Sequence, residues 1–467
     1  EPLAARDLLP DLYAARRFRP LWSDADRRRE LLALVRASAD VGLTPADYHV
    51  AVLERYADDI GAESDPFGRA DRDLILTDAL ARLTHHLVYG KVDPFRLDPH
   101  WNFHPATEEG DPLAMLSGAL EAESLAEFFE RRLERGMLYR QLVAALARYR
   151  GIAASGGWQP IPEGPTLKPG MRDPRVAAVR SRLAAEASLP AVSDPWQYDA
   201  GVEAAVTAFQ RRYGLEPDGI VGARTLTAMN VSPGARIDQI RVNLERARWV
   251  LDRPGRDYLV VNIAGFRAFL MHGDGIRWEA RVVVGRPFRR TPVFGSRIVY
   301  LVFNPTWTVP PVILKNDVIP EAIADPAAVT RRGLQVVAAD GSVIPPEALD
   351  WARYRSGALP YQLVQAPGPG NALGRVKFIL PNAYNVYLHD TPGRELFRSA
   401  DRSFSSGCIR VERPLELAAL LLDEDPEWGA GEIDTAVATG RTRTVFLPRP
   451  VPVMILYWTA GMGRDGE

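Results

Sequence analysis

The spacing of apolar residues changes near residue 258, and this change limits the folds that the chain can adopt. Residues 1–155 place apolar side chains three and four positions apart, as in "DLILTDALARLTHHLVYGKV", with arginine-rich opposite faces. That spacing predicts amphipathic helices. From Tyr258 the period is two, in "YLVVNI", "FRAFLM" and "IRWEARVVVG", with "AG" and "HGDG" between the runs. This pattern predicts strands joined by hairpins, so we expect a helical N-terminal part and a mainly-β C-terminal half.

Length and composition require several domains and exclude some classes of protein. A chain of 467 residues is too long for one core and suggests about three domains of roughly 150 residues each. No run of eighteen apolar residues is present, so no membrane-spanning helix is expected. The net charge of −2 argues against nucleic acid as a partner. The chain begins at Glu1 without an apolar leader, so we expect any export signal or membrane anchor to lie outside this sequence.

A short helical unit is expected between the two halves. The Gly- and Pro-rich segment 156–174 is typical of a linker. Two amphipathic patterns and the helix-forming "GARTLTAMN" follow it, which predicts a three-helix bundle over residues 160–231. The segment "IDQIRVNLERARWVLD" predicts one more helix, and we expect residues 232–255 to pack back on the domain formed by residues 1–155.

The remaining residues, 256–460, are expected to form one mainly-β domain with an insertion. Further strands are predicted over 296–303, 375–380, 384–389, 442–447 and 451–460. Residues 305–374 differ, because they are rich in proline and contain helical fragments such as "VILKNDVIPEAIA". A segment of that length is more typical of an inserted subdomain or lid than of a loop. The fold class predicted for the whole chain is therefore α+β and multidomain.

The only cysteine, Cys408, lies in "LHDTPGRELFRSADRSFSSGCIRV", which also contains one of seven histidines, His389. A lone cysteine is often only a small buried hydrophobe. Here its neighbours are polar, and the predicted strand "YNVYLH" would place His389 at a strand end. Gly407 allows a sharp turn, and the amides of Gly407 and Cys408 can point at a developing oxyanion. An imidazole nearby can take the thiol proton and give a reactive thiolate–imidazolium pair.

The segment around Cys408 resembles the active-site signature of the YkuD-type L,D-transpeptidase family. That signature is a His, a variable gap, and Ser/Thr-His-Gly-Cys followed by a hydrophobic residue and Arg or Asn. On this sequence the base falls on His389, the nucleophile on Cys408, the turn glycine on Gly407 and the small hydroxyl residue on Ser405. The chain departs from the signature at Ser406, where the family usually has His.

Other segments extend the resemblance over most of the chain. "VVVGRPFRRTPVF" and "FNPTWTVPPVI" are similar to segments of the family's catalytic domain. "AVTAFQRRYGLEPDGIVGARTLTAMN" resembles the three-helix peptidoglycan-binding module. The N-terminal helical part is similar to a scaffold domain. All of these segments, with "NVYLHDTP" and the long insertion, resemble the large YcbB-like branch of the family.

The resemblance implies an enzyme acting on peptidoglycan stem peptides, without a cofactor or a metal. Cys408 would attack the carbonyl of the third residue, a diamino acid, and expel the terminal D-Ala as a thioester forms. The side-chain amine of another stem would then resolve the thioester into a 3→3 crosslink, with His389 as base in both steps. The protein would work in the periplasm and bind the glycan strand through its three-helix module. Other wall-synthesis enzymes are candidate partners. Carbapenems would acylate Cys408.

Further residues are candidates for substrate contacts. Arg410 would lie on the same strand face as Cys408 and could bind a substrate carboxylate, or it could form a structural salt bridge. Trp307 could line the acceptor side of the cleft or pack the insertion. Tyr387, Ser405 and Ser406 are expected to contact the substrate as well. Asp390 is the one acidic residue beside His389, and because it should point away, a backbone carbonyl is expected to orient the imidazole.

Two other functions remain open from the sequence. In the first, water accepts the acyl group, and the protein is an L,D-carboxypeptidase that only trims stem peptides. In the second, the protein is a wall-binding scaffold without catalysis, which the presence of His389, Gly407 and Cys408 together argues against. The lid expected over 305–374 would favour an amine over water by excluding solvent.

Overall fold

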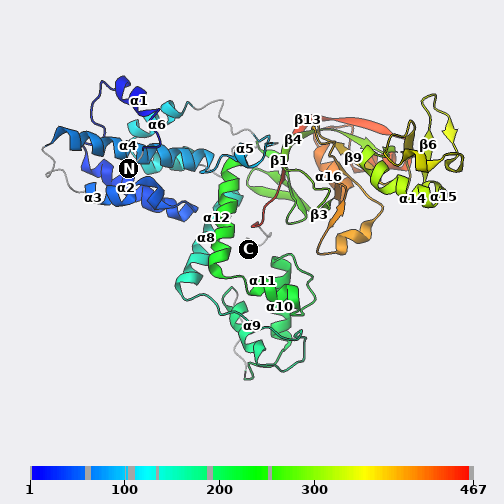
Figure 1. Cartoon of the computed structure of the whole chain (residues 1–467), viewed down its shortest axis with the longest axis horizontal. Coiled ribbons are helices and arrows are strands. Elements are labelled where there is room, and N and C mark those ends of the chain that lie inside the picture. The colour runs from blue at the N-terminus through cyan, green and yellow to red at the C-terminus, as the bar shows by residue number, and fades with distance from the viewer. Residues whose placement is uncertain are drawn as a thin grey trace. The chain divides into compact units, whose positions relative to one another are not determined.

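The computed structural model describes residues 3–57, 65–99, 101–103, 111–132, 136–186, 193–250 and 255–461. The chain divides into two compact units, one formed by Glu1–Pro254 with Thr459–Glu467 and the other by Gly255–Trp458 (Figure 1). Among the described residues, none of the helices has the length and apolar character needed to cross a membrane.

The first unit begins with a group of helices that share one apolar core. Its helices are α1 (Leu9–Ala15), α2 (Ala25–Ala37), α3 (Val50–Tyr56), α4 (Pro66–Tyr89), α5 (Pro94–Leu97), α6 (Pro112–Glu121), α7 (Leu125–Arg132) and α8 (Met137–Ala154). Aspartates at the N-caps of α2, α4, α5 and α6 accept backbone N–H bonds that the first helical turn leaves unpaired. Leu31, Val35, Leu80 and Leu83 are fully buried in the core that these helices enclose.

Helix α12 (Pro233–Val250) returns to this helical group after the small module. Arg248 donates to the Tyr139 hydroxyl at 3.1 Å, and Arg241 donates to the Gly42 carbonyl at 3.0 Å. These bonds join α12 to α8 and to the turn that follows α2, so the helical domain is built from two separate stretches of sequence.

The small module consists of α9 (Arg175–Ala184), α10 (Ala200–Arg212) and α11 (Ala223–Met229). Val179, Val206 and Met229 are fully buried in its core, at the three- and four-residue spacings read from the sequence. An isolated bridge between Leu167 and Val221 ties the incoming segment to the bundle.

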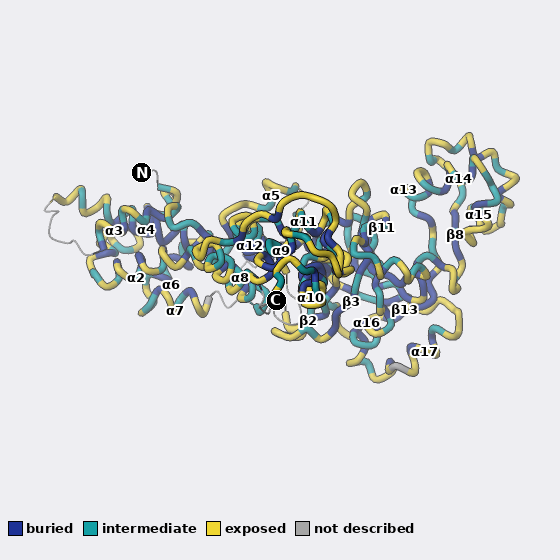
Figure 2. Tube along the Cα trace, turned by 90° about the horizontal axis from the view of Figure 1, so that it is seen from below, coloured by how far each residue is buried: buried dark blue, intermediate teal, exposed yellow. Residues whose placement is uncertain are grey.

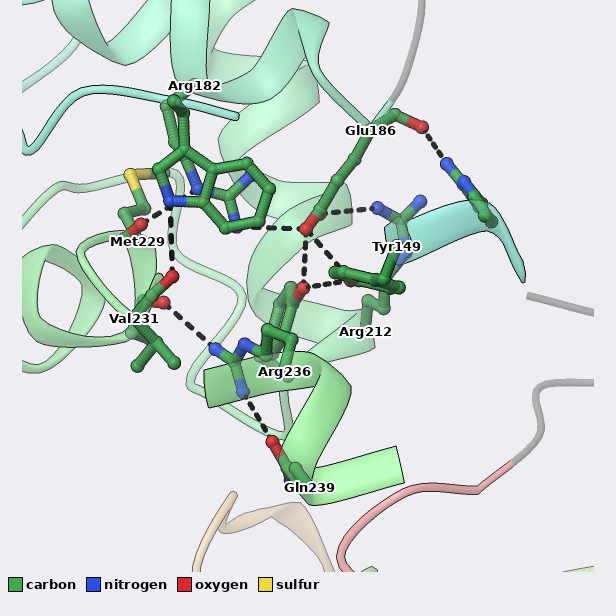
Figure 3. Close-up of polar contacts among 12 residues, drawn as sticks. Tyr149, Arg182, Glu186, Arg212, Met229, Val231, Arg236 and Gln239 are labelled. Atoms are coloured by element: carbon green, nitrogen blue, oxygen red, sulfur yellow. Dashed lines mark hydrogen bonds and ion pairs between the residues drawn. The ribbon is translucent and has the colours of Figure 1, made fainter. Parts of the chain in front are cut away.

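A buried carboxylate, Glu186, links the module to α8 (Figure 3). It follows α9 and accepts hydrogen bonds from the hydroxyls of Tyr149 at 2.9 Å and Tyr213 at 2.7 Å. It also pairs with Arg182 at 2.9 Å and with Arg212 at 3.3 Å. Burial by itself would raise the pKa of Glu186, but Arg182 and the hydroxyl donors Tyr213 and Tyr149 hold this pKa below its usual value.

The second unit is built on a nine-stranded sheet in the order β11-β3-β12-β10-β9-β4-β13-β1-β2. The strands are β1 (Asp257–Asn262), β2 (Arg267–His272), β3 (Gly275–Gly285), β4 (Phe294–Phe303), β9 (Val376–Ile379), β10 (Leu388–His389), β11 (Ser403–Ser405), β12 (Ile409–Val411) and β13 (Arg443–Leu456). Because β3 also pairs with β2, the sheet closes on itself around an apolar core. Helices α16 (Pro414–Leu421) and α17 (Ala430–Ala438) contribute to that core.

Two strand predictions were wrong. The segment predicted over 384–389 forms a strand only at Leu388–His389, because Asn385 has a left-handed φ of 55° and the Asn382 side chain bonds the backbone of Val386 in both directions. The two strands predicted over 442–447 and 451–460 are one continuous strand, β13, whose register shifts between Phe446 and Val451.

Residues 305–374 fold into a subdomain with its own sheet and core. Strands β5 (Trp307–Thr308), β6 (Leu334–Val337), β7 (Val343–Ile344) and β8 (Gln362–Gln365) pair in the order β5-β8-β6-β7. Helices α13 (Pro311–Ile313), α14 (Ile319–Ala324) and α15 (Ala327–Arg331) accompany them, with a π-helical turn at Leu314–Val318. In Figure 2, α13, α14, α15 and β8 gather in one lobe of the unit. We call residues 305–374 the capping subdomain.

Candidate active site around Cys408

Neighbouring parallel strands bring His389 and Cys408 to the same face of the sheet. Strand β10 pairs with β12, with Leu388 opposite Ile409 and His389 opposite Arg410. Leu388 and Ile409 are fully buried in the core. Because side chains alternate along a strand, His389 and Arg410 point to the other face, as does Cys408, which directly precedes β12. The two residues predicted from the sequence therefore lie on the same face of one strand pair, although nineteen positions separate them.

Cys408 is partly buried and bonded on several sides. Its Sγ contacts the Asn385 carbonyl at 3.8 Å, and Tyr387 approaches the sulfur with both its amide and its hydroxyl. Burial raises the pKa of the Cys408 thiol, and the hydrogen bonds from Tyr387 and the charges of Lys377 and Arg410 offset that increase only in part. The thiol is therefore protonated at neutral pH.

His389 is buried, and a backbone carbonyl orients its ring. Nδ1 lies 2.5 Å from the Asp390 carbonyl oxygen, which can only accept, so the proton is on Nδ1 and Nε2 is the ring's acceptor atom. The Asp390 carboxylate pairs with Arg375 and Arg394 instead of with the imidazole. Burial lowers the pKa of His389 to about 3, and Arg410 adds to this effect.

These pKa shifts correct the expected thiolate–imidazolium pair. Both groups are shifted toward their neutral forms, because burial disfavours either charge and because positively charged side chains face the imidazole. The resting site therefore holds a thiol and a neutral imidazole.

The loop before Cys408 is held by three hydroxyl contacts. Ser405 Oγ donates to the Cys408 carbonyl at 2.6 Å and accepts from the Gly407 amide at 3.1 Å. Thr291 donates to the Gly407 carbonyl at 2.8 Å. Gly407 has a φ of 120°, a conformation that residues with a side chain rarely adopt.

Two roles expected from the sequence change in the light of these bonds. Ser405 is buried and holds the loop, so it does not face a substrate as expected. The Gly407 amide is bonded to Ser405 and is not available to an oxyanion. Within the described part of the chain, the Cys408 amide has no hydrogen-bond acceptor, so this amide is the available donor.

Arg410 lies beside His389 with no carboxylate partner among the described residues. Its Nε is buried without a hydrogen-bond partner there, and the structural salt bridge considered from the sequence is not found in that part of the chain. A buried guanidinium nitrogen without a partner is costly unless a bound group satisfies it. Arg410 remains a candidate for binding a substrate carboxylate.

The capping subdomain reaches the site through two contacts. Trp307 packs against the subdomain's core, and its indole N–H donates to the hydroxyl of Tyr387, the residue that contacts the Cys408 sulfur. Arg289 donates to Ser406 Oγ at 3.0 Å and pairs with both carboxylate oxygens of Asp317 at 2.5 and 3.1 Å. Asp317 belongs to the π-helical turn of the capping subdomain.

Sequence reasoning missed the charged residue Lys377 in the site. It lies on β9 directly opposite His389, and its Nζ lies 3.7 Å from the centroid of the Tyr387 ring. The signal was its place in "RVKFIL", where it stands between Val376 and Phe378 and must face away from the core. Arg289 and Asp317 gave no comparable signal.

Family models match three segments of the chain. Residues 256–445 match the model described as "L,D-transpeptidase catalytic domain", residues 172–229 match "Putative peptidoglycan binding domain", and residues 7–146 match "Scaffold domain". A protein of Haemophilus influenzae named "Putative L,D-transpeptidase" is 34% identical over 222 residues. That match covers 48% of this chain and 44% of the relative, so the chain spans less than half of the relative's length.

Solved structures of L,D-transpeptidases are also similar to the chain. One from Stackebrandtia nassauensis is 12% identical and covers 64% of this chain and 97% of its own, with a TM-score of 0.24. One from Xylanimonas cellulosilytica is 14% identical and covers 63% of this chain and 100% of its own, with a TM-score of 0.20. By its family models, this chain carries an L,D-transpeptidase catalytic domain joined to a peptidoglycan-binding domain and a scaffold domain.

Proposed function

We propose that the protein forms 3→3 crosslinks between peptidoglycan stem peptides through a thioester on Cys408. The observation that supports this most strongly is the placement of Cys408 on the same sheet face as His389, whose Nδ1 is held by a carbonyl so that Nε2 can act as the base. A peptidoglycan-binding domain in the same chain supports the choice of substrate. We propose that the protein acts in the periplasm, where this substrate lies.

The first half of the reaction forms the acyl-enzyme. The Cys408 Sγ attacks the carbonyl carbon of the third stem residue while its proton moves to His389 Nε2. The Cys408 amide donates to the oxyanion that forms. As the oxyanion collapses, the amide C–N bond breaks and the D-Ala nitrogen takes the proton from His389, which leaves a thioester and free D-Ala.

The second half transfers the acyl group to an acceptor stem. Its side-chain amine attacks the thioester carbonyl and passes a proton to His389, and the C–S bond breaks as the sulfur is reprotonated. A neutral imidazole suits this sequence, because a base that is already protonated could accept neither proton. Arg410 is a candidate to bind a carboxylate of the stem peptide with its unpaired guanidinium nitrogen.

The capping subdomain would favour an amine over water as acceptor. Trp307 and Asp317 place it against Tyr387 and Arg289 at the site, which supports a role in excluding solvent. Its loss would then raise hydrolysis relative to crosslinking.

The test is incubation of the purified protein with a disaccharide-tetrapeptide. The wild type should release D-Ala and form a crosslinked dimer, while Cys408→Ala should do neither. Release of D-Ala with tripeptide but no dimer would identify an L,D-carboxypeptidase instead. Absence of all products would refute an enzymatic role on this substrate, and full function of Cys408→Ala in cells would favour the scaffold.

A carbapenem offers an independent test of the nucleophile. Its strained β-lactam carbonyl resembles the scissile carbonyl, so intact-protein mass spectrometry should show one adduct on the wild type and none on Cys408→Ala. An unmodified wild type would contradict the assignment of Cys408.

A further inference from the structure

Three residues with basic side chains lie in one row across neighbouring strands of the catalytic sheet. Lys377 on β9 is opposite His389 on β10, and His389 is opposite Arg410 on β12. Because residues paired across strands point to the same face, the imidazole lies between the side chains of Lys377 and Arg410. Cys408 is on this same face, two residues before Arg410.

The ammonium group of Lys377 has no acidic partner in the part of the chain that the structure describes and contacts an aromatic ring of the site. Its side chain is half-buried, and within the described residues no carboxylate pairs with it. Its ammonium group instead lies over the Tyr387 ring, 3.7 Å from the centroid. Only four of the 57 Lys and Arg residues in the chain are lysines, so a lysine here stands out against an arginine-rich composition.

The positive charge of Lys377 lowers the pKa of both the Cys408 thiol and the His389 imidazole. A positive charge near Cys408 favours the thiolate over the thiol. The same charge beside His389 disfavours its protonated form. Both effects move the proton equilibria of the pair to lower pH.

Other charged groups face the pair, and they set the background for this effect. Tyr387, which directly precedes β10, contributes its hydroxyl, and Arg410 contributes its guanidinium from β12, while Arg286 and Glu395 act on Arg410 in turn. Asp390 is paired with Arg375 and Arg394 and does not offset the two cations. Lys377 is thus a charge that can be removed without breaking an ion pair.

We propose that Lys377 is a positioning residue that shifts the working pH range of the Cys408–His389 pair downward, by holding an unpaired positive charge against Tyr387 on the face that carries both groups. This rests on the proposed function only in taking Cys408 as the nucleophile and His389 as the base.

Alkylation of the single thiol tests the proposal without any peptidoglycan. Iodoacetamide labelling of the whole protein, followed by intact mass at a series of pH values, reports only on Cys408. Lys377→Met should move the midpoint of labelling up by about one pH unit, so that labelling on the acidic side slows about tenfold. Lys377→Arg, which keeps the charge, should stay close to the wild type.

Controls separate the charge effect from structural damage. Lys168→Met removes an exposed lysine of the binding module and should leave the labelling curve unchanged. Lys377→Gln serves if Lys377→Met does not fold, as judged by circular dichroism and thermal melting. An unchanged midpoint in a folded Lys377→Met or Lys377→Gln protein would overturn the proposal.

The crosslinking assay gives the second readout. Both the acid and the alkaline limbs of kcat/KM should move to higher pH in Lys377→Met. If KM rises while neither limb moves, Lys377 binds substrate and the proposal is wrong. If the wild type forms no product but the labelling curve still shifts, the proposed function fails while the role of Lys377 stands.

Discussion

Replacing Glu186 by alanine should destabilise the contact between the peptidoglycan-binding module and α8. The substitution removes a carboxylate that pairs with Arg182 and Arg212 and accepts from Tyr149 and Tyr213. The Arg182 side chain is fully buried, so its charge cannot recover water when its partner is lost. Breaking a buried pair in this way costs about 3–5 kcal/mol.

Two contacts reduce that estimate for Arg182. Its guanidinium stacks on the Trp158 ring at 3.6 Å, and its Nε donates to the Met229 carbonyl at 2.8 Å. Both contacts remain in Glu186→Ala, so we expect a loss near the lower end, about 3 kcal/mol. Glu186→Gln keeps one acceptor for the tyrosine hydroxyls and should lose less, about 2 kcal/mol.

Hydrogen exchange measured by mass spectrometry on the whole chain is the suitable assay, because a multidomain protein does not unfold in one step. Amides of α9, α10 and α8 that open together should exchange about a hundredfold faster in Glu186→Ala, since each 1.4 kcal/mol is about a factor of ten. Glu216→Ala, at an exposed site of the same module, should change exchange little. Equal exchange in the two variants would refute the structural role of the buried carboxylate.

Three further predictions concern the catalytic unit. His389 has a folded pKa of about 3, below its unfolded value of about 6.5, so its contribution to stability is full above the unfolded pKa and is lost as pH falls toward the folded pKa. The acid-induced loss of stability should therefore be smaller in His389→Gln than in the wild type. Equal losses in the two proteins would contradict a buried neutral imidazole. Ser405→Ala removes two hydrogen bonds from the turn before Cys408 and should lower the free energy of unfolding by about 1–3 kcal/mol. It should also slow carbapenem acylation of Cys408. An unchanged acylation rate would show that the turn keeps its conformation without the Ser405 hydroxyl. Arg289→Met and Asp317→Asn should each raise the ratio of hydrolysed to crosslinked product. The double variant should raise this ratio little further, because each single substitution already breaks the same ion pair. Additive effects on the ratio would exclude a shared contact.

The sequence predicted the parts of the fold that depend on local patterns. Alternation in "IRWEARVVVG" corresponds to β3, and the four-three-four spacing from Val202 to Tyr213 corresponds to α10. The pattern failed at Asn385, because this left-handed residue keeps the strand from beginning before Leu388, and the alternating residues before His389 gave no sign of it. It also failed at β13, where the prolines between Phe446 and Val451 suggested a break that the sheet accommodates as a register shift.

At the site, the motif identified residues but not their protonation. His389 and Cys408 were predicted from their neighbours in sequence, and the orienting carbonyl followed from the strand end. Their neutral resting state depends on burial and on Lys377 and Arg410, which reach His389 from two other strands. Register between strands of distant sequence is not encoded locally, so a prediction from one strand alone could not include those charges.

Ser406 stands where the family signature usually has His, and its hydrogen bond from Arg289 links this position to the capping subdomain. Arg289 spans from Ser406, the second residue before Cys408, to Asp317 of the capping subdomain. An imidazole at position 406 would replace the hydroxyl that accepts from Arg289, and a chain lacking the subdomain would leave that guanidinium without its carboxylate. Ser406 and the capping subdomain therefore share Arg289 as a partner, and removing either one should leave a polar group of Arg289 without its bond beside Cys408.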